Sequence, residues 1–179
     1  GLDFAYELHS NFIILVNDND MSIAENHGGL YQNLRQLRET DGQHPCNLFR
    51  AMGLDYRFVK NGNDIGEMIA MLQEVKGIDH PVVVHMVTQK GKGYAPAEQN
   101  KENWHWCMPF DLETGKSTVS FDGPDYGTMT ADFLLKKMKA DPKVVAVTAA
   151  VPAVFGFTAE KREEAGSQFV DVGIAEEHA

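Results

Sequence analysis

Residues 12–23 read FIILVNDNDMSI, an apolar run that ends directly in a cluster of amide and carboxylate side chains. The run predicts a buried strand of a parallel α/β sheet, which we place at residues 11–17. Sheets of this kind bind their ligands just outside the carboxyl ends of their strands. The side chains that follow the run offer oxygen ligands, which suit Mg²⁺ held together with a phosphate group.

Two other interpretations of the polar cluster compete with a metal site. Asn and Asp are common turn residues, so the cluster can be a turn without a ligand. An EF-hand loop also has alternating acidic positions, but here Ile23 stands where that loop needs glycine and Gly29 where it needs a bidentate glutamate. The turn and the metal site stay open on this reasoning, and the EF-hand is excluded.

Hydrophobic periodicity and cap residues predict alternating helices and strands along the rest of the chain, which favours a parallel α/β fold with a βαβ unit. Residues 89–126 have little periodicity and many glycines and prolines, which is typical of long functional loops or linkers. The expected helices are 28–39, 47–52, 65–76 and 129–140, with the end of a helix in 1–10 and another beginning at Ile174, and the expected strands are 56–59, 81–88, 144–147 and 168–172.

The charge of the chain limits its partners. Its 179 residues carry a formal net charge of −10, which argues against nucleic acid. A phosphorylated ligand is compatible with this charge if a metal ion or backbone N–H groups offset it. No apolar run approaches the roughly 20 residues of a membrane span. The start lacks the basic residues of a signal peptide, both ends suggest a piece of a longer chain, and Cys46 and Cys107 are expected to be reduced thiols.

Several further residues are candidates for function, each with a structural alternative. The sequence KGKGY at 90–94 is suited to bring backbone N–H groups to an anion, and the alternative is a solvated basic turn. His105 lies between two tryptophans, in a substrate pocket or in a packed aromatic loop. Glu176 lies where an acidic residue often only offsets a helix dipole. His85, inside an apolar strand, is expected to be a satisfied core histidine.

Three separated motifs resemble the 1-deoxy-D-xylulose-5-phosphate synthase family, relatives of transketolase: VNDNDMSIAEN, KGKGYAPAE and DVGIAEEHA. The resemblance implies that the Asn19 side chain and the Met21 carbonyl hold Mg²⁺ on the cofactor diphosphate, and that Tyr94 contacts thiamine diphosphate. It implies that His105, at the family's spacing before a Phe-Asp pair, faces the substrate side of the cofactor. It also implies that Glu176 hydrogen-bonds N1′ of the aminopyrimidine ring, a role that suits a buried carboxyl group.

The activity that the resemblance implies is a transferase reaction. Pyruvate condenses with D-glyceraldehyde 3-phosphate to 1-deoxy-D-xylulose 5-phosphate, with loss of CO₂, for isoprenoid and thiamine synthesis. The family also implies a cytoplasmic homodimer without nucleic-acid or membrane partners. The expected domains are the C-terminal part of a diphosphate-binding domain at 1–111, a linker at 112–126 and the N-terminal part of a pyrimidine-binding domain at 127–179.

The family's G-D-G motif, whose Asp is another metal ligand, lies roughly thirty residues before the Asn of the second motif half. We therefore expect it upstream of Gly1, and we expect the 179-residue piece to be inactive by itself. The chain also departs from the family pattern at several points. The segment 38–46 is shorter, G-H-D reads G-N-D at 62–64, tryptophans flank His105, and Glu177 stands where Gln is frequent.

Two alternatives to this function stay open. One is a different thiamine enzyme, such as a transketolase or a 2-oxo acid decarboxylase component. The other is a non-enzymatic outcome, either an inactive truncated piece or a simple nucleotide-binding α/β module. No GxGxxG sequence follows either apolar strand, which argues against the nucleotide-binding module.

Overall fold

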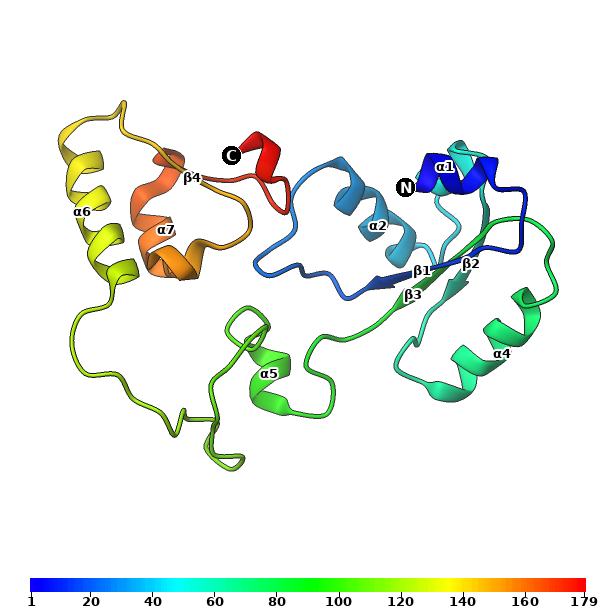
Figure 1. Cartoon of the computed structure of the whole chain (residues 1–179), viewed down its shortest axis with the longest axis horizontal. Helices are drawn as coiled ribbons and strands as arrows, with labels where there is room; N and C mark the ends of the chain where they lie inside the picture. Colours follow the sequence, from blue (N-terminus) through cyan, green and yellow to red (C-terminus); the bar gives the residue numbers. More distant parts are fainter. The chain divides into compact units, whose positions relative to one another are not determined.

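The computed structural model describes residues 1–179 (Figure 1). The contacts between residues define two compact units in this chain. The first unit contains residues 1–20 and 28–99, and the second contains residues 21–27 and 100–179. Both units have parallel strands accompanied by helices, so the predicted α/β fold class is confirmed. The domain division expected from the sequence, with a linker at 112–126, stays a prediction.

The elements of the first unit are α1 (Leu2–Glu7), β1 (Ile13–Asp18), α2 (Gly29–Glu39), α3 (Leu48–Ala51), β2 (Asp55–Val59), α4 (Ile65–Val75), β3 (Val82–Val87) and α5 (Ala95–Gln99). The three strands form one parallel sheet with the order β1-β3-β2. Because β2, α4 and β3 follow one another and the two strands pair in parallel, the predicted βαβ unit is confirmed. Asn47 caps α3 and Asp64 caps α4.

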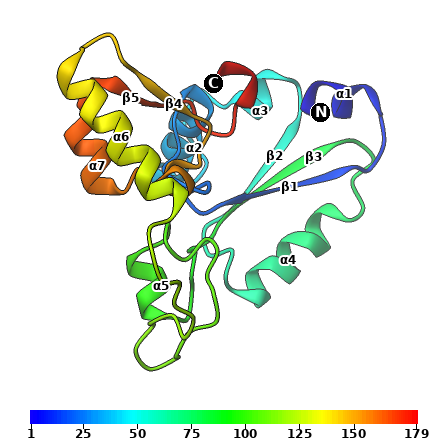
Figure 2. The same cartoon turned by 60° about the vertical axis from the view of Figure 1, so that its left-hand side comes forward.

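Helices cover both faces of this sheet, with α2 and α3 on one face and α4 on the other (Figures 1 and 2). On the first face Leu37 of α2 and Phe49 of α3 belong to the same buried cluster as Val83. On the second face Val75 of α4 is buried with Val84. Successive residues of a strand point to opposite faces, which explains how Val83 and Val84 belong to different clusters. Both faces of β3 are therefore buried.

The first apolar run forms the parallel strand β1, as predicted, but the strand is only partly buried. In the three-stranded sheet it lies at the edge and pairs with β3. Phe12 and Leu15 are each 48% exposed. An edge strand has a neighbour on one side only, so an apolar run can specify a strand without complete burial.

The helix α4 is also less buried than its pattern indicates. Val75 is completely buried, and Met68 and Met71 pack against the same cluster, but Ile65 is 76% exposed and Ile69 is 51% exposed. The sheet therefore covers a narrower part of the helix than the apolar stripe in the sequence.

The elements of the second unit are α6 (Tyr126–Ala140), β4 (Ala146–Thr148), η1 (Pro152–Phe155), α7 (Ala159–Ala165), η2 (Gly166–Gln168), β5 (Phe169–Asp171) and η3 (Glu176–His178), where η marks a 3₁₀ helix. The strands β4 and β5 pair in parallel. Leu135 and Met138 of α6 are buried in one cluster with Phe157 and with Ala165 of α7. Phe169 of β5 packs against this cluster, so α6 and α7 share one core with the strand pair.

Element boundaries in this unit differ from the sequence predictions for local reasons. The helix α6 begins at Tyr126 rather than at 129, because Asp125 caps it by accepting a 2.8 Å hydrogen bond from the Thr128 N–H. The helix α7 was not predicted, since its sequence AEKREEA has no apolar periodicity. The strand expected at 144–147 lies at Ala146–Thr148. The helix expected to begin at Ile174 is only the single 3₁₀ turn η3.

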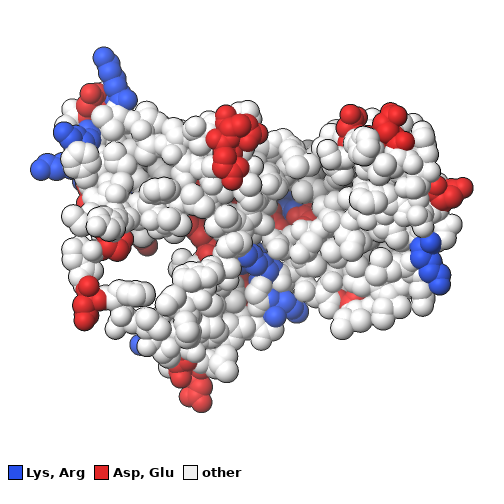
Figure 3. Space-filling model, in the orientation of Figure 1, with Lys and Arg blue, Asp and Glu red and all other residues white.

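Two properties concern the whole chain. None of its helices combines the length and the hydrophobicity that crossing a membrane requires. Cys46 and Cys107 are both free thiols, as predicted. On the face shown in Figure 3, basic and acidic side chains are scattered, and no continuous basic patch appears.

Candidate functional site

The carboxyl ends of β1 and β3 are joined by hydrogen bonds. The Thr88 hydroxyl donates to the Asn17 side-chain oxygen at 2.5 Å, and the Thr88 N–H donates to the Asp18 carbonyl at 2.9 Å. These contacts continue the parallel register, in which Asp18 lies opposite Val87. The polar cluster that follows β1 therefore lies at the ligand-binding edge expected of a parallel sheet.

The loop after β2 is attached to the same edge. The Gly62 N–H donates to the Val87 carbonyl at 2.7 Å, and the Asn63 side chain accepts a 2.7 Å hydrogen bond from the Gln89 N–H. A Cβ on Gly62 would be 2.8 Å from the Val87 oxygen, so this close approach requires glycine. Asn63 stands where the family pattern G-H-D has His. Through this hydrogen bond it fixes the start of the segment that leads to KGKGY.

Asp18 is the most heavily bonded carboxylate at this edge. Its side chain is 2% exposed, and both of its oxygens lie 2.7 Å from Nη1 of Arg38. A third contact comes from Nε2 of His85 at 2.8 Å. Burial by itself raises the pKa of Asp18, but the hydrogen bonds from His85 and Arg38 outweigh burial and lower this pKa to about 2. Asp18 is therefore an ionised, structurally engaged carboxylate.

His85 connects this carboxylate to the centre of the sheet. It is completely buried, and its Nδ1 lies 2.7 Å from the Tyr56 hydroxyl. Burial raises the pKa of Tyr56, so its hydroxyl keeps its proton. Because the Asp18 carboxylate only accepts hydrogen bonds, Nε2 donates to it. The prediction of a satisfied core histidine is confirmed.

Asn19 and Asp20 follow directly after β1. Asn19 is half-buried. Asp20 has a positive φ of 61°, its N–H donates to the Asp18 carboxylate at 3.2 Å, and its own carboxylate binds Nη2 of Arg38. The turn that the sequence left open as an alternative is therefore present. A turn at this position is compatible with a metal ligand at Asn19.

The loop at 90–94 supports an anion site less than its sequence indicates. A helix opens directly after this loop, but α5 has only five residues. The Gly93 N–H donates to the Glu98 carboxylate at 2.8 Å, so it is not available to an external anion. Gly91 has a φ of 79°, and a Cβ there would lie 2.7 Å from the Ala97 backbone. Tyr94 is half-buried directly before this helix.

In the second unit, residues 21–27 form a compact loop. Met21 and Glu25 form an isolated antiparallel bridge, and the Ser22 N–H donates to the Ala24 carbonyl at 3.1 Å. The Met21 carbonyl was the second metal ligand implied by the family resemblance.

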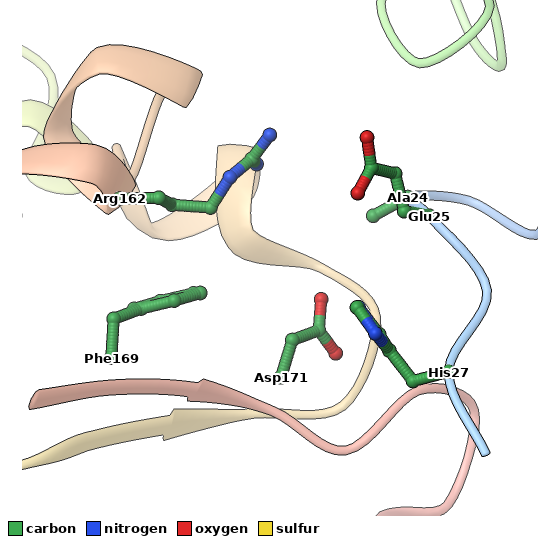
Figure 4. Close-up of a pocket in the computed structure, with 6 residues that line it drawn as sticks. All are labelled: Ala24, Glu25, His27, Arg162, Phe169 and Asp171. Carbon is green, nitrogen blue, oxygen red and sulfur yellow. The ribbon is translucent and has the colours of Figure 1, made fainter. Parts of the chain in front are cut away.

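Residues of this loop line a cavity of about 230 Å³ together with Arg162, Phe169 and Asp171 (Figure 4). The side chains of Arg162 and Glu25 point toward each other across it. Glu102 also binds Arg162 through two contacts of 2.9 and 3.0 Å and raises its pKa. Asp171 accepts 2.9 Å hydrogen bonds from the Ala150 and Gly173 N–H groups, so it fixes the chain just before η3. Arg162 is thus paired with Glu102, and Asp171 with backbone N–H groups.

His105 lies in a loop that is aromatic but only partly packed. Trp104 and Phe110 meet edge to face with their ring centres 4.6 Å apart, and both line a second cavity of about 230 Å³. Trp106 is 73% exposed, and His105 is exposed as well. The packed-loop alternative therefore describes Trp104 and not the histidine.

Glu176 lies near the end of the 179 residues. It begins the 3₁₀ turn η3 and is exposed there. Its hydrogen bond to N1′ of the aminopyrimidine ring stays a prediction. Asn19 and Tyr94 belong to the first unit, and Met21, His105 and Glu176 belong to the second.

No three His, Cys, Asp or Glu side chains are grouped as a metal site would require. The donors implied by the resemblance are an amide oxygen and a backbone carbonyl, which are hard oxygen ligands suited to Mg²⁺. Sequence reasoning missed the group formed by Asp18, Arg38 and His85. Its sequence signals were a histidine inside an apolar strand and an aspartate at the end of another.

Comparisons with known proteins give one consistent result. The family model described as 1-deoxy-D-xylulose-5-phosphate synthase matches residues 1–46 and 40–88. The two matched parts meet within 38–46, the segment expected to be shorter than in the family. The chain is 35% identical over 216 residues to 1-deoxy-D-xylulose-5-phosphate synthase 1 of Geobacter sulfurreducens, covering 100% of the chain and 34% of that protein.

Two further relatives bear the name 1-deoxy-D-xylulose-5-phosphate synthase. The protein of Clostridium perfringens is 37% identical over 205 residues, covering 94% of the chain and 33% of the relative. The protein of Listeria monocytogenes is 37% identical over 192 residues, covering 100% of the chain and 30% of the relative. The chain thus spans about a third of the length of the curated relatives it matches.

Proposed function

Because the chain belongs to the 1-deoxy-D-xylulose-5-phosphate synthase family, we propose that the full-length protein condenses pyruvate with D-glyceraldehyde 3-phosphate. The product is 1-deoxy-D-xylulose 5-phosphate, and CO₂ is lost. The observation that carries the proposal is the position of Asn19, which follows β1 at the carboxyl end of a parallel sheet within the family motif. Ligand sites of α/β sheets lie at this edge.

The cofactors of this reaction would be thiamine diphosphate and Mg²⁺. Asn19 would bind the metal through its side-chain oxygen, and Met21 through its backbone carbonyl. The donor chemistry fits, because both groups are neutral oxygen ligands of the kind that Mg²⁺ accepts beside phosphate. The aspartate of G-D-G, a further ligand in the family, is not among residues 1–179.

When bound, thiamine diphosphate supplies the carbon nucleophile, and the protein holds and orients it. Tyr94 would contact the cofactor, and Glu176 would hydrogen-bond N1′ of its aminopyrimidine ring. His105 would face the substrate. His105 is exposed, and its chain neighbour Trp104 lines a cavity with Phe110, which supports a role in contacting small polar molecules.

The larger organisation follows the same proposal. Residues 1–111 would belong to the diphosphate-binding domain and residues 127–179 to the pyrimidine-binding domain, joined by 112–126. The complete protein would be a cytoplasmic homodimer, and its mass in solution checks the dimer.

Product analysis of the full-length protein tests the activity. With pyruvate, D-glyceraldehyde 3-phosphate, Mg²⁺ and thiamine diphosphate, we expect 1-deoxy-D-xylulose 5-phosphate and CO₂. Asn19→Ala should weaken cofactor binding by about ten- to hundredfold, as loss of a metal ligand or its support does. Calorimetry at saturating Mg²⁺ measures this affinity. Acetaldehyde or a transketolase product, with no 1-deoxy sugar, would show a different thiamine enzyme.

His105→Ala tests the substrate role separately. We expect turnover to fall while thiamine diphosphate affinity stays near that of the wild type, because the histidine would contact substrate and not cofactor. Trp106→Ala is a matched control, since this neighbour is 73% exposed in the same loop. Wild-type turnover in His105→Ala would assign the histidine to the loop structure alone.

A further inference from the structure

We propose that Arg38 is a positioning residue that fixes Asn19 by binding the aspartates on both sides of it. The inference rests on the proposed function, because it gives Arg38 a role in binding Mg²⁺ and thiamine diphosphate. One guanidinium group contacts the carboxylates of Asp18 and Asp20, and the residue between them is the proposed metal ligand.

The first contact attaches the turn to the folded core. Asp18 ends β1, and Nη1 of Arg38 lies 2.7 Å from each of its carboxylate oxygens. His85, on the central strand β3, binds the same carboxylate at 2.8 Å. Asp18 is therefore held between a helix and the middle of the sheet, and it cannot shift without breaking contacts to both.

The second contact holds the backbone in an unfavourable conformation. Asp20 has a φ of 61°, a region that residues other than glycine adopt at a cost and usually only where contacts enforce it. Two contacts enforce it here, since its N–H donates to Asp18 at 3.2 Å and its carboxylate binds Nη2 of Arg38. The direction in which the chain leaves Asn19 is thereby set.

The helix α2 fixes Arg38 itself. Leu37, the preceding residue, is completely buried in the core cluster, and the Arg38 side chain is 15% exposed. A packed helix therefore presents the guanidinium at the carboxyl end of β1. Its planar fork has separate N–H groups for two carboxylates, whereas lysine offers a single point charge.

Arg38 also pairs the charges on both sides of Asn19. It offsets part of the negative charge of Asp18 and Asp20, and it engages both carboxylates. Without it, the buried Asp18 would keep its contact to His85 but lose its cationic partner, and the two carboxylates would repel each other on either side of Asn19. The amide oxygen of Asn19 would then lose its fixed direction, and ligand orientation is what supporting residues contribute to metal affinity.

The test measures Mg²⁺ dependence of thiamine diphosphate binding by calorimetry in the full-length protein. We expect Arg38→Gln to raise the half-saturating Mg²⁺ concentration by about ten- to hundredfold. Arg38→Lys should raise it less, because it keeps the charge and loses the fork. Arg35→Gln is the matched control, since Arg35 is exposed on the same helix, and its value should stay within about twofold of the wild type.

Thermal unfolding of the cofactor-free variants separates positioning from a structural role. If Arg38→Gln lowers the unfolding temperature but binds Mg²⁺ like Arg35→Gln, the inference is overturned. If Arg38→Gln does not fold, Arg38→Lys decides by the same comparison. Asn19→Ala separates this outcome from failure of the proposed function. Normal cofactor binding by Asn19→Ala, or no cofactor binding by the wild type, would overturn both the proposed function and the inference about Arg38. If Asn19→Ala binds the cofactor weakly and the Arg38 variants bind it normally, only the inference is overturned.

Discussion

At the scale of single residues, Asp18 shows how partners reverse the effect of burial on a charge. Burial raises its pKa, yet the hydrogen bonds from His85 and Arg38 bring it from 3.8 to about 2. A pKa that is lower in the folded state than in the unfolded chain stabilises folding at pH values above the unfolded pKa. That contribution is lost as the pH falls through the folded pKa, here between about pH 4 and about pH 2.

We therefore expect an acid-dependent difference between the wild type and Asp18→Asn. In the metal-free full-length protein, the Asp18 charge should contribute roughly 2 kcal/mol to the free energy of unfolding near pH 6, and less below about pH 4. Denaturant unfolding across this range measures the difference. Asp122→Asn, at an exposed position, should show no such trend. A wild-type advantage that is equal at pH 6 and pH 2.5 would contradict this account.

At the scale of elements, the junction of α6 and η1 depends on two glycines. A Cβ on Gly156 would overlap the carbonyl oxygen of Gly127, and Gly156 also has a φ of 74°. A Cβ on Gly127 would lie 2.6 Å from the Val154 oxygen. The first turn of α6 and the end of η1 thus approach closely only because neither position carries a side chain.

Gly156→Ala should destabilise the protein by about 2 kcal/mol or more, since it adds both backbone strain and a clash. Gly173→Ala is the matched control, because Gly173 has a φ of 75° but nothing lies within 4 Å of its Cβ position. Its cost should be the strain alone, about 1 kcal/mol. Unfolding midpoints of the two variants give the comparison, and equal losses would show that the contact with Gly127 contributes nothing.

At the scale of the whole molecule, the net charge of −10 repels the proposed diphosphate ligand, which is also negatively charged. No basic patch appears on the face in Figure 3, and the Gly93 N–H in the KGKGY loop is bound to Glu98. A metal ion is therefore the natural counter-charge for a diphosphate. Arg38 offsets part of the negative charge locally, because it binds the two aspartates on either side of the proposed metal-binding residue Asn19.

Much of the fold could be predicted from the sequence, because it depends on interactions between near neighbours. The apolar runs of β1 and β3 specify strands. Asn47 and Asp64 specify helix starts, since each cap accepts hydrogen bonds from residues two or three positions away. Helix α7 escaped prediction, because its charged sequence has no apolar periodicity and Ala165 is its single buried residue.

The sequence by itself determined the strand, the polar cluster after it and the family motif that contains Asn19. The tertiary structure decided that β1 is an edge strand and that Arg38 and His85 hold the turn. Arg38 lies 20 positions from Asp18, and His85 lies 67 positions from it. No local pattern encodes such pairs. They form because parallel pairing aligns the carboxyl ends of the strands and because packing of Leu37 orients the last turn of α2 toward that edge.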